Sequence, residues 1–291
     1  MENKKLKDLL VRTASATVML LIFVGAVFLS KWSAAALFAV IMIGGLVEFY
    51  NLCRQRGYKP MYGFGIISSL LLFVALAGGI LYLKVDEALV GGVAALVMLY
   101  VMVAVPAIFI YEIWRKSETP IANVATTFMG VLYVGVPMSL LVLIPYLLDL
   151  GHKGEWSPWA LMAFVSIIWA NDVFAYLVGV SCGKHRLCER ISPKKSWEGF
   201  FGGLIGAVGL AVLFGHLFEG SLVRWGIMGL IAALTGVAGD LVESMFKREV
   251  GVKDSGKIMP GHGGFLDRFD ALFIAVPFVV IYLSITLFLF V

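Results

Sequence analysis

Carboxylates inside apolar runs are the residues of this 291-residue sequence that first suggest chemistry, because a charge in such a run is costly and by default functional. Asp240 lies in one run, three residues before Glu243 and so about one helical turn along the same face. Asp267 and Asp270, again three apart, stand at the start of the next run. Carboxylates at one membrane depth repel each other and need a counter-charge. We therefore expect Asp240 and Asp267 to bind a metal or another cation.

Other acidic positions widen or limit this set. Asp172 follows Asn171 in an earlier apolar run, and we expect it at the same depth as Asp240. The simpler interpretation of such a carboxylate is a buried hydrogen-bond partner or a side chain that reaches the surface. We favour that interpretation for Glu48 and Glu243.

The segment from Ser244 to Asp270 is dense in groups that bind phosphates. Glycines let backbone N–H groups close around anionic oxygens, and lysine and arginine neutralise them. Residues 260–264, Pro-Gly-His-Gly-Gly, also fit a simple turn that leads into a helix. The part from Gly251 to Lys257 approaches the Walker A pattern, but Ile258 stands where that pattern needs Ser or Thr, and no strand precedes it.

A second polar segment, 192–199, reads Ser-Pro-Lys-Lys-Ser-Trp-Glu-Gly and contains Lys194 and Lys195. These lysines suit phosphate binding, but they also suit an ordinary basic anchor with an interfacial tryptophan, and the sequence leaves both open. The glycines that follow predict close helix packing rather than a phosphate loop. They are Gly199, Gly202, Gly203, Gly206 and Gly209.

Membrane-spanning helices must position these residues. The chain is 60% apolar and 14% charged, with a mean hydropathy of +0.94, which excludes an ordinary soluble domain. The net charge of +4 is small and scattered, so we expect no nucleic-acid partner. Stretches long enough to cross about 30 Å of hydrocarbon predict an all-α polytopic membrane protein with about nine transmembrane helices. They are 13–30, 33–52, 63–83, 88–112, 122–148, 157–181, 199–218, 225–246 and 265–290.

Basic residues predict the orientation. With the N-terminus in the cytoplasm and the C-terminus outside, the cytoplasmic segments hold 19 of the 23 Lys and Arg residues, and the outside segments hold four. The two longest polar connections, about 182–198 and 247–264, then both face the cytoplasm. We expect a single membrane domain over 1–291, with the first five spans in 1–150 and the catalytic helices and loops in 151–291.

The three cysteines, Cys53, Cys182 and Cys188, all fall on the expected cytoplasmic side, where thiols stay reduced. We therefore expect no disulfide. Cys182 and Cys188 flank His185 in a Cys-x2-His-x2-Cys array. This array lacks an adjacent fourth ligand and matches none of the usual zinc spacings, so zinc binding there is a minor alternative.

The stretch 244–270 closely resembles the signature of the CDP-diacylglycerol synthase (phosphatidate cytidylyltransferase) family, S-x2-K-R-x4-K-D-x-G-x2-hydrophobic-P-G-H-G-G-x2-D-R-x-D. Upstream, Asn171-Asp172, Tyr176, Gly179, Gly183-Lys184 and 192–199 look like a second block of that family. The resemblance is specific over about 165–275 and rests on hydropathy before that. The sequence departs from the family at Ser255, where phenylalanine is frequent, and we expect this to affect packing more than chemistry.

The resemblance implies transfer of a cytidylyl group from CTP to phosphatidic acid, which gives CDP-diacylglycerol and pyrophosphate with Mg²⁺. A second cation, divalent or monovalent, is compatible with it. Metal binding falls to Asp240 and Asp267, with Asp172 and Asp270 as weaker candidates. The implied catalytic residues are Asp240, Asp267, Lys247, Arg248 and His262, although His262 fits a structural turn equally well. The implied substrate-binding residues are Asn171, Ser192, Lys194, Lys195, Ser244, Lys253, Asp254, Gly261, Gly263, Gly264 and Arg268.

The same resemblance places the protein in the inner (cell) membrane, among membrane lipids, with its active site facing the cytoplasm and with a homodimer allowed. One rival is a transporter whose carboxylates bind a coupling ion, but nine spans do not divide into two equal inverted repeats. Another CTP-dependent lipid or polyprenol phosphotransferase would need similar residues, and the sequence does not exclude it.

Overall fold

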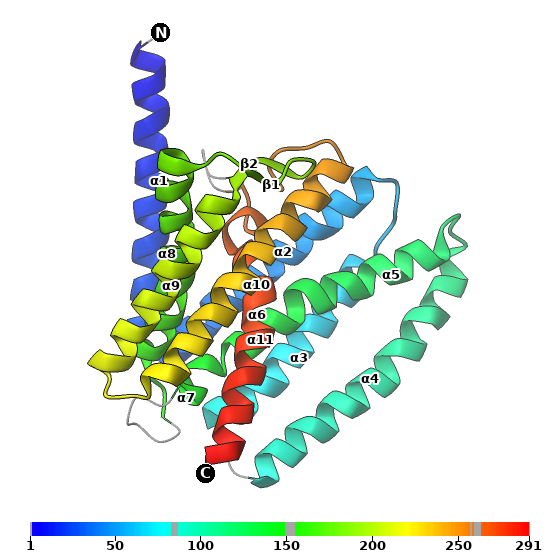
Figure 1. Ribbon diagram of the computed structural model, residues 1–291. Coiled ribbons are helices and arrows are strands. Elements are labelled where there is room, and N and C mark those ends of the chain that lie inside the picture. The colour runs from blue at the N-terminus through cyan, green and yellow to red at the C-terminus, as the bar shows by residue number, and fades with distance from the viewer. Residues whose placement is uncertain (1, 83–86, 149–154, 257, 259–262, 291) are drawn as a thin grey trace. The chain divides into compact units, whose positions relative to one another are not determined.

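The computed structural model describes residues 2–82, 87–148, 155–256, 258 and 263–290, and helices dominate it (Figure 1). The first helices are α1 (Glu2–Leu29), α2 (Lys31–Gln55), α3 (Tyr62–Tyr82), α4 (Glu87–Arg115) and α5 (Pro120–Gly130). A π-helical turn, η1 (Val131–Gly135), then leads into α6 (Val136–Leu141) and α7 (Ile144–Leu147). The last helices are α8 (Pro158–Cys182), α9 (Trp197–Leu217), α10 (Leu222–Glu249) and α11 (Leu266–Phe290).

Eight candidate membrane spans, found among the described residues, coincide with eight of the nine stretches expected from the sequence. The first expected span, 13–30, falls on α1, whose apolar part Thr13–Leu29 is shorter than the others. The prediction of an all-α polytopic membrane protein is therefore confirmed. The orientation of the two termini stays a prediction.

The chain forms two compact units, which are described separately. The N-terminal unit consists of Met1–Val142 and Glu249–Arg268, and the C-terminal unit consists of Leu143–Arg248 and Phe269–Val291. The segment after α10, which the sequence grouped with the later helices, thus packs with the N-terminal helices.

The core of the N-terminal unit surrounds α2, which contacts α1, α3, α5 and α6. The buried Tyr50 hydroxyl donates a hydrogen bond to the Thr127 carbonyl of α5 over 2.9 Å. A side chain at Gly65 or Gly130 would collide with the Tyr50 ring, so both glycines let the neighbouring helices approach α2. This packing fixes the part of α2 that also carries Glu48.

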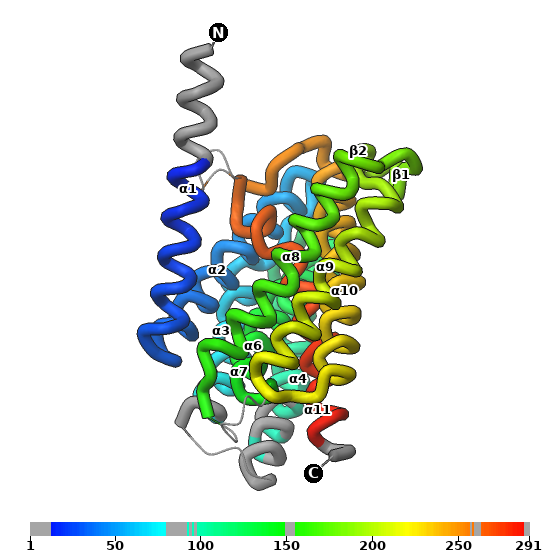
Figure 2. The backbone as a smooth tube through the Cα atoms, turned by 60° about the vertical axis from the view of Figure 1, so that its left-hand side comes forward, coloured from blue at the N-terminus to red at the C-terminus, as the bar shows by residue number. Residues whose placement is uncertain are grey.

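In the C-terminal unit, α8 and α9 run side by side (Figure 2). A Cβ atom at Gly199 would lie 2.7 Å from the Ala175 carbonyl oxygen, and one at Gly203 would lie 2.7 Å from that of Asn171. Gly202 and Gly206 likewise face α8 side chains, so the predicted packing role is confirmed for these four glycines. A Cβ atom at Gly209 would meet nothing within 4 Å, so Gly209 does not share this role.

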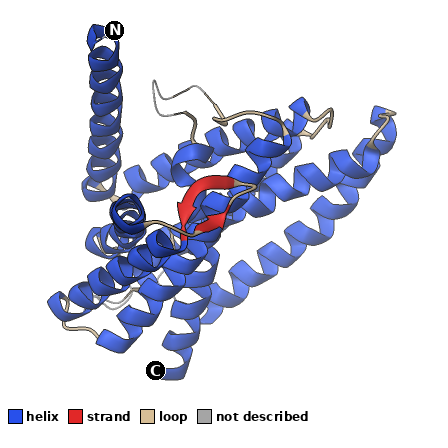
Figure 3. Cartoon of the chain, turned by 45° about the horizontal axis from the view of Figure 1, so that its top comes forward, coloured by secondary structure: helices blue, strands red, loops and turns tan. Residues whose placement is uncertain are grey.

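A two-stranded antiparallel hairpin joins α8 to α9, and the sequence did not predict it (Figure 3). Its strands are β1 (Arg186–Cys188) and β2 (Ser192–Ser196), with an irregular register between Arg186 and Cys188. The last residue of β2 is also the N-cap of α9, because the Ser196 hydroxyl accepts the Gly199 N–H over 3.2 Å. The hairpin therefore leads Lys194 and Lys195 directly into the start of α9.

Candidate active site

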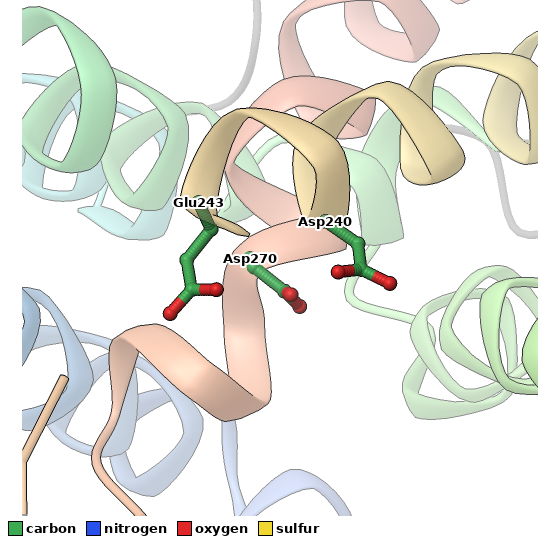
Figure 4. A group of neighbouring side chains, drawn as sticks. All are labelled: Asp240, Glu243 and Asp270. Atoms are coloured by element: carbon green, nitrogen blue, oxygen red, sulfur yellow. The ribbon is translucent and has the colours of Figure 1, made fainter. Parts of the chain in front are cut away.

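Three carboxylates of the C-terminal unit gather where α10 meets α11 (Figure 4). Asp240 and Glu243 extend from α10, and Asp270 of α11 lies between them in this view. One oxygen of each lies within 4.8 Å of the others. Hard divalent cations prefer such oxygen ligands, so this arrangement is suited to a metal ion.

A glycine allows these helices to come so close. A Cβ atom at Gly239 would lie 3.0 Å from the Ala271 Cα and would collide with the Asp270 carbonyl. The backbones of α10 and α11 therefore touch one residue before Asp240. This contact sets the separation of the carboxylates that the two helices carry.

Cationic and polar side chains already contact the cluster. The Lys195 ammonium of β2 contacts the Asp240 carboxylate. Lys247, one turn after Glu243, pairs with it at 2.5 Å, and the Ser244 hydroxyl donates to Asp240 Oδ1 over 3.2 Å. Two lysines thus pair with carboxylates of the cluster, and this pairing reduces the mutual repulsion of the carboxylates.

A cavity of about 370 Å³ opens beside Asp240. Asp172 and Asn171 of α8 line it together with Lys194 and Lys195 of the hairpin. The Asn171 side chain is 1% exposed, and its Oδ1 has no hydrogen-bond partner among the described residues. Apolar and aromatic side chains form much of the remaining wall, among them Tyr176, Val180, Leu187, Phe200 and Val237. The cavity therefore offers anionic, cationic and apolar surfaces to a ligand.

The hairpin is tied to α9 by Glu198, whose carboxylate accepts the Lys184 and His185 N–H groups over 3.1 and 3.2 Å. The His185 Nδ1 also lies 2.6 Å from Glu198 Oε1. Cys182 and Cys188 do not join His185 in any ligand cluster found among the described residues. His185 of the Cys-x2-His-x2-Cys array thus contacts Glu198 at the base of the hairpin. This contact gives no support to the zinc alternative.

In the N-terminal unit, Asp267 organises the end of the glycine-rich segment. Its Oδ2 accepts the Gly264 N–H over 2.8 Å, the Ser255 N–H over 2.9 Å and the Ser255 hydroxyl over 2.9 Å. The predicted role of Glu48 as a buried hydrogen-bond partner is confirmed, because its Oε2 accepts from Ser255 and from the Leu266 N–H. The predicted metal role of Asp267 stays a prediction.

The remaining predicted residues lie in several settings. Arg248 lies in the last turn of α10, and its Nε donates to the Ile191 carbonyl of the hairpin over 3.3 Å. Ser192 is the first residue of β2. Three charged residues are exposed, namely Lys253, Asp254 and Arg268. Gly263 has a φ of +80°, which favours glycine, while Gly261 and His262 lie outside the described residues.

The sequence interpretation missed one member of the cluster. Glu243 is 1% exposed and pairs with Lys247, as expected of a buried partner, but its carboxylate also joins those of Asp240 and Asp270. The spacing of three residues after Asp240 was the available signal. That spacing alone could not show that α11 brings Asp270 against this face.

The comparisons with known proteins agree on one family. Residues 10–286 match the model of the cytidylyltransferase family. A phosphatidate cytidylyltransferase of Staphylococcus aureus (strain COL) is 33% identical over 274 residues, which is 92% of this chain and 96% of the relative. Those of Staphylococcus haemolyticus and Staphylococcus epidermidis are 32% and 33% identical over 270 residues, with the same coverage.

Proposed function

This chain belongs to the cytidylyltransferase family, and we propose that it transfers the cytidylyl group of CTP to phosphatidic acid at the cavity of the C-terminal unit. The products are CDP-diacylglycerol and pyrophosphate. The observation that carries this proposal is the cluster of Asp240, Glu243 and Asp270 beside a cavity with two lysines and an apolar wall. A nucleotide triphosphate, a lipid phosphate and an acyl chain need such surfaces together.

The donor set of the cluster fits Mg²⁺, because three carboxylates offer hard oxygen ligands within a short distance. Asp240, Asp270 and Glu243 would hold the ion, and Asp172, which lines the same cavity, is a further candidate. Mg²⁺ would supply a counter-charge for the polyphosphate chain and its leaving group. Asp267 is kept as a proposed ligand from the sequence pattern.

The reaction needs little general-base assistance. A phosphate monoester has a second pKa of about 6, so the lipid phosphate is already largely anionic at neutral pH. One of its oxygens forms a bond to the α-phosphorus of CTP, the bond from that phosphorus to the bridging oxygen breaks, and pyrophosphate leaves. The task of the protein is to bring two polyanions together, which it does by positioning and charge neutralisation.

The lysines are placed for that task. Lys195 contacts Asp240 in the structure, and it would be available to a phosphate oxygen if Asp240 held a cation instead. Lys194 lines the same cavity from the exposed side of β2. Lys247 is anchored on Glu243 and strengthens the positive potential near the cluster. We assign the leaving-group end of CTP to these cations.

The protein is an integral membrane protein, and we place it in the cell membrane with this cavity on the cytoplasmic side. Two arguments support that orientation. The charge asymmetry of 19 against four Lys and Arg residues favours cytoplasmic polar loops. CTP is also a cytosolic substrate, whereas phosphatidic acid reaches the site from the bilayer.

A dual-label assay tests the proposal. Detergent-solubilised protein is incubated with phosphatidic acid and with CTP labelled at either the α- or the γ-phosphate. Cytidylyl transfer moves only the α label into the lipid fraction and releases the γ label as pyrophosphate. Transfer of the γ label into lipid would instead indicate a CTP-dependent lipid kinase. Wild-type protein that transfers neither label, while Mg²⁺ and both substrates are in excess, would contradict the proposed function.

A further inference from the structure

A carboxylate from α2 holds the segment that precedes α11. Glu48 is 3% exposed, and its Oε2 accepts the Leu266 N–H over 2.9 Å and the Ser255 hydroxyl over 2.9 Å. Leu266 is the first residue of α11, so its N–H has no partner within the helix. Glu48 therefore caps α11 from a helix more than 200 positions earlier, within the N-terminal unit.

Ser255 links Glu48 to Asp267. Its hydroxyl lies 2.9 Å from Glu48 Oε2 and 2.9 Å from Asp267 Oδ2, and its N–H donates to the same Asp267 oxygen. A hydroxyl has one hydrogen to donate, so the Glu48 and Asp267 carboxylates share the hydrogen of this hydroxyl. A displacement of Glu48 must therefore change how Ser255 holds Asp267.

Two glycines of the segment make room for Glu48. A Cβ atom at Gly256 or at Gly264 would collide with the Glu48 carboxylate. The sequence pattern suggested phosphate binding for Gly264, but the structure shows a steric reason for the absence of a side chain there. The Ser255 hydroxyl contacts both carboxylates, and the sequence did not predict these contacts.

We propose that Glu48 is a positioning residue for the transferase reaction. Through Leu266 and Ser255 it fixes the start of α11 and the Asp267 carboxylate. The expected effect of Glu48 on the reaction rate rests on the proposed function. Its effect on the hydrogen bonds of Ser255 and Leu266 does not. The alternative is that Glu48 stabilises the fold alone, as any helix cap does.

Glu112 provides a matched control. It is another buried carboxylate of the N-terminal unit, 5% exposed, at the end of α4. It accepts hydrogen bonds from Arg115, Ser117 and Asn123, none of which belongs to the segment 255–267. Glu112→Ala should thus lower stability as Glu48→Ala does, without any contact to that segment.

The kinetic test compares Glu48→Ala, Glu48→Gln and Glu112→Ala at equal amounts of folded protein. Misplacement of Asp267 should lower kcat of Glu48→Ala at least about tenfold, with the KM for CTP changed less than about twofold. Glu48→Gln should recover most of the rate, because its amide oxygen accepts the same bonds. Glu112→Ala should keep the wild-type kcat. Wild-type kcat in Glu48→Ala, or an equal loss in Glu112→Ala, would overturn the positioning role.

A second kinetic comparison uses the steric fit. Gly264→Ala should lose activity because its methyl group meets the Glu48 carboxylate, and that loss should shrink in a Glu48→Ala background, where the space is free. Losses that multiply independently would show that Glu48 and Gly264 do not act together and would contradict the proposal.

Hydrogen–deuterium exchange followed by mass spectrometry decides the structural part without any activity. In Glu48→Ala, and in Ser255→Ala should the first variant not fold, peptides that contain the Ser255 and Leu266 amides should exchange at least about tenfold faster than in wild type. In Glu112→Ala their exchange should be unchanged. Equal exchange in all variants overturns the inference, whereas an inactive wild type with faster exchange in Glu48→Ala would contradict only the proposed function.

Discussion

Asp240 lies among basic, polar and acidic side chains in the candidate site. It contacts Lys195, accepts a hydrogen bond from Ser244, and has a carboxylate oxygen within 4.8 Å of oxygens of Glu243 and Asp270. Cations close by stabilise a carboxylate that has two acidic neighbours, and Lys195 serves that purpose in the structure. A divalent cation held by Asp240 would take over this role and would leave Lys195 available to a phosphate oxygen.

This arrangement predicts that the aspartates dominate the rate. Asp240→Asn and Asp270→Asn keep the size of the side chain but remove a charged ligand, so turnover at limiting Mg²⁺ should fall at least about a hundredfold. Glu243→Gln should be milder, because Lys247 already neutralises Glu243. Glu189→Gln, an exposed change on the hairpin, serves as the control. Near-normal turnover in both aspartate variants would rule out the assignment.

The lysines of the hairpin can be tested by a change that preserves charge. Arginine at Lys195 cannot place a compact ammonium group against Asp240 and a phosphate, so Lys195→Arg should raise the KM of one substrate or lower kcat about tenfold or more. Lys194→Arg should have a smaller effect, since Lys194 is exposed. Arg190→Lys controls for charge alone. Wild-type steady-state kinetics in the Lys194→Arg, Lys195→Arg double variant would show that the hairpin lysines act only as a basic membrane anchor.

The cost of a charge in an apolar run singles out Asp172, Asp240 and Asp270, and each of them lines the cavity or belongs to the carboxylate cluster. This cost does not identify the partners. Glu243 meets Asp270 of α11, and Ser255 meets Glu48 of α2, so these partners come from distant segments that no local pattern encodes. The sequence therefore predicts which buried charges need a partner better than it predicts which residues are the partners.

At the element scale, glycines decide how closely the helices of the C-terminal unit approach. Gly203 allows the α9 backbone to reach Asn171 of α8, and Gly239 allows α10 to reach Asp270 of α11. Both contacts involve residues of the cavity or of the carboxylate cluster. The small residues thus set the dimensions of the site without touching a ligand.

A pair of alanine variants isolates this effect. At Gly203 a Cβ atom would lie 2.7 Å from the Asn171 carbonyl oxygen, so Gly203→Ala should cost about 1–3 kcal/mol through overpacking and should lower activity. Gly209→Ala meets nothing within 4 Å and should be neutral or slightly stabilising. Thermal unfolding in detergent, followed by tryptophan fluorescence, compares them. Equal Tm values for the two variants would show that α8 and α9 are not closely packed at Gly203.

The helices were predictable because about twenty apolar residues in succession have few alternatives. The hairpin was not, since β1 and β2 are three and five residues long and polar, without the alternation that indicates a strand. Its existence depends on α8 and α9, which bring its two ends together. The break of the fifth span into α5, η1, α6 and α7 does have a signal in the sequence, because Pro137 and Pro145 stand in the first turns of α6 and α7.

At the scale of the whole molecule, the orientation in the membrane decides which solution reaches the cavity. The hairpin and the turn between α9 and α10 stand at opposite ends of α9, whose 21 residues span about 31 Å. The count of basic residues assigns the hairpin end to the cytoplasm. The access of CTP to the site depends on that assignment.

Cysteine labelling tests the orientation. After Cys53, Cys182 and Cys188 are replaced by serine, Glu189→Cys on the hairpin should react with an impermeant maleimide only in inside-out vesicles. Ser221→Cys, in the turn before α10, should react only in right-side-out vesicles or intact cells. Labelling of both positions from the same side, or a reversed pattern, would contradict the proposed topology.

Mn²⁺ binding shows directly whether the cluster of Asp240, Glu243 and Asp270 holds the divalent cation of the reaction. Electron paramagnetic resonance counts the Mn²⁺ bound to purified protein in detergent, without substrate or turnover. Wild type and Glu189→Gln should bind the ion equally, while Asp240→Asn and Asp270→Asn should weaken binding at least about tenfold, since each removes a charged ligand. Mn²⁺ binding that is the same in wild type and in both aspartate variants would contradict the assignment of the cation to this cluster.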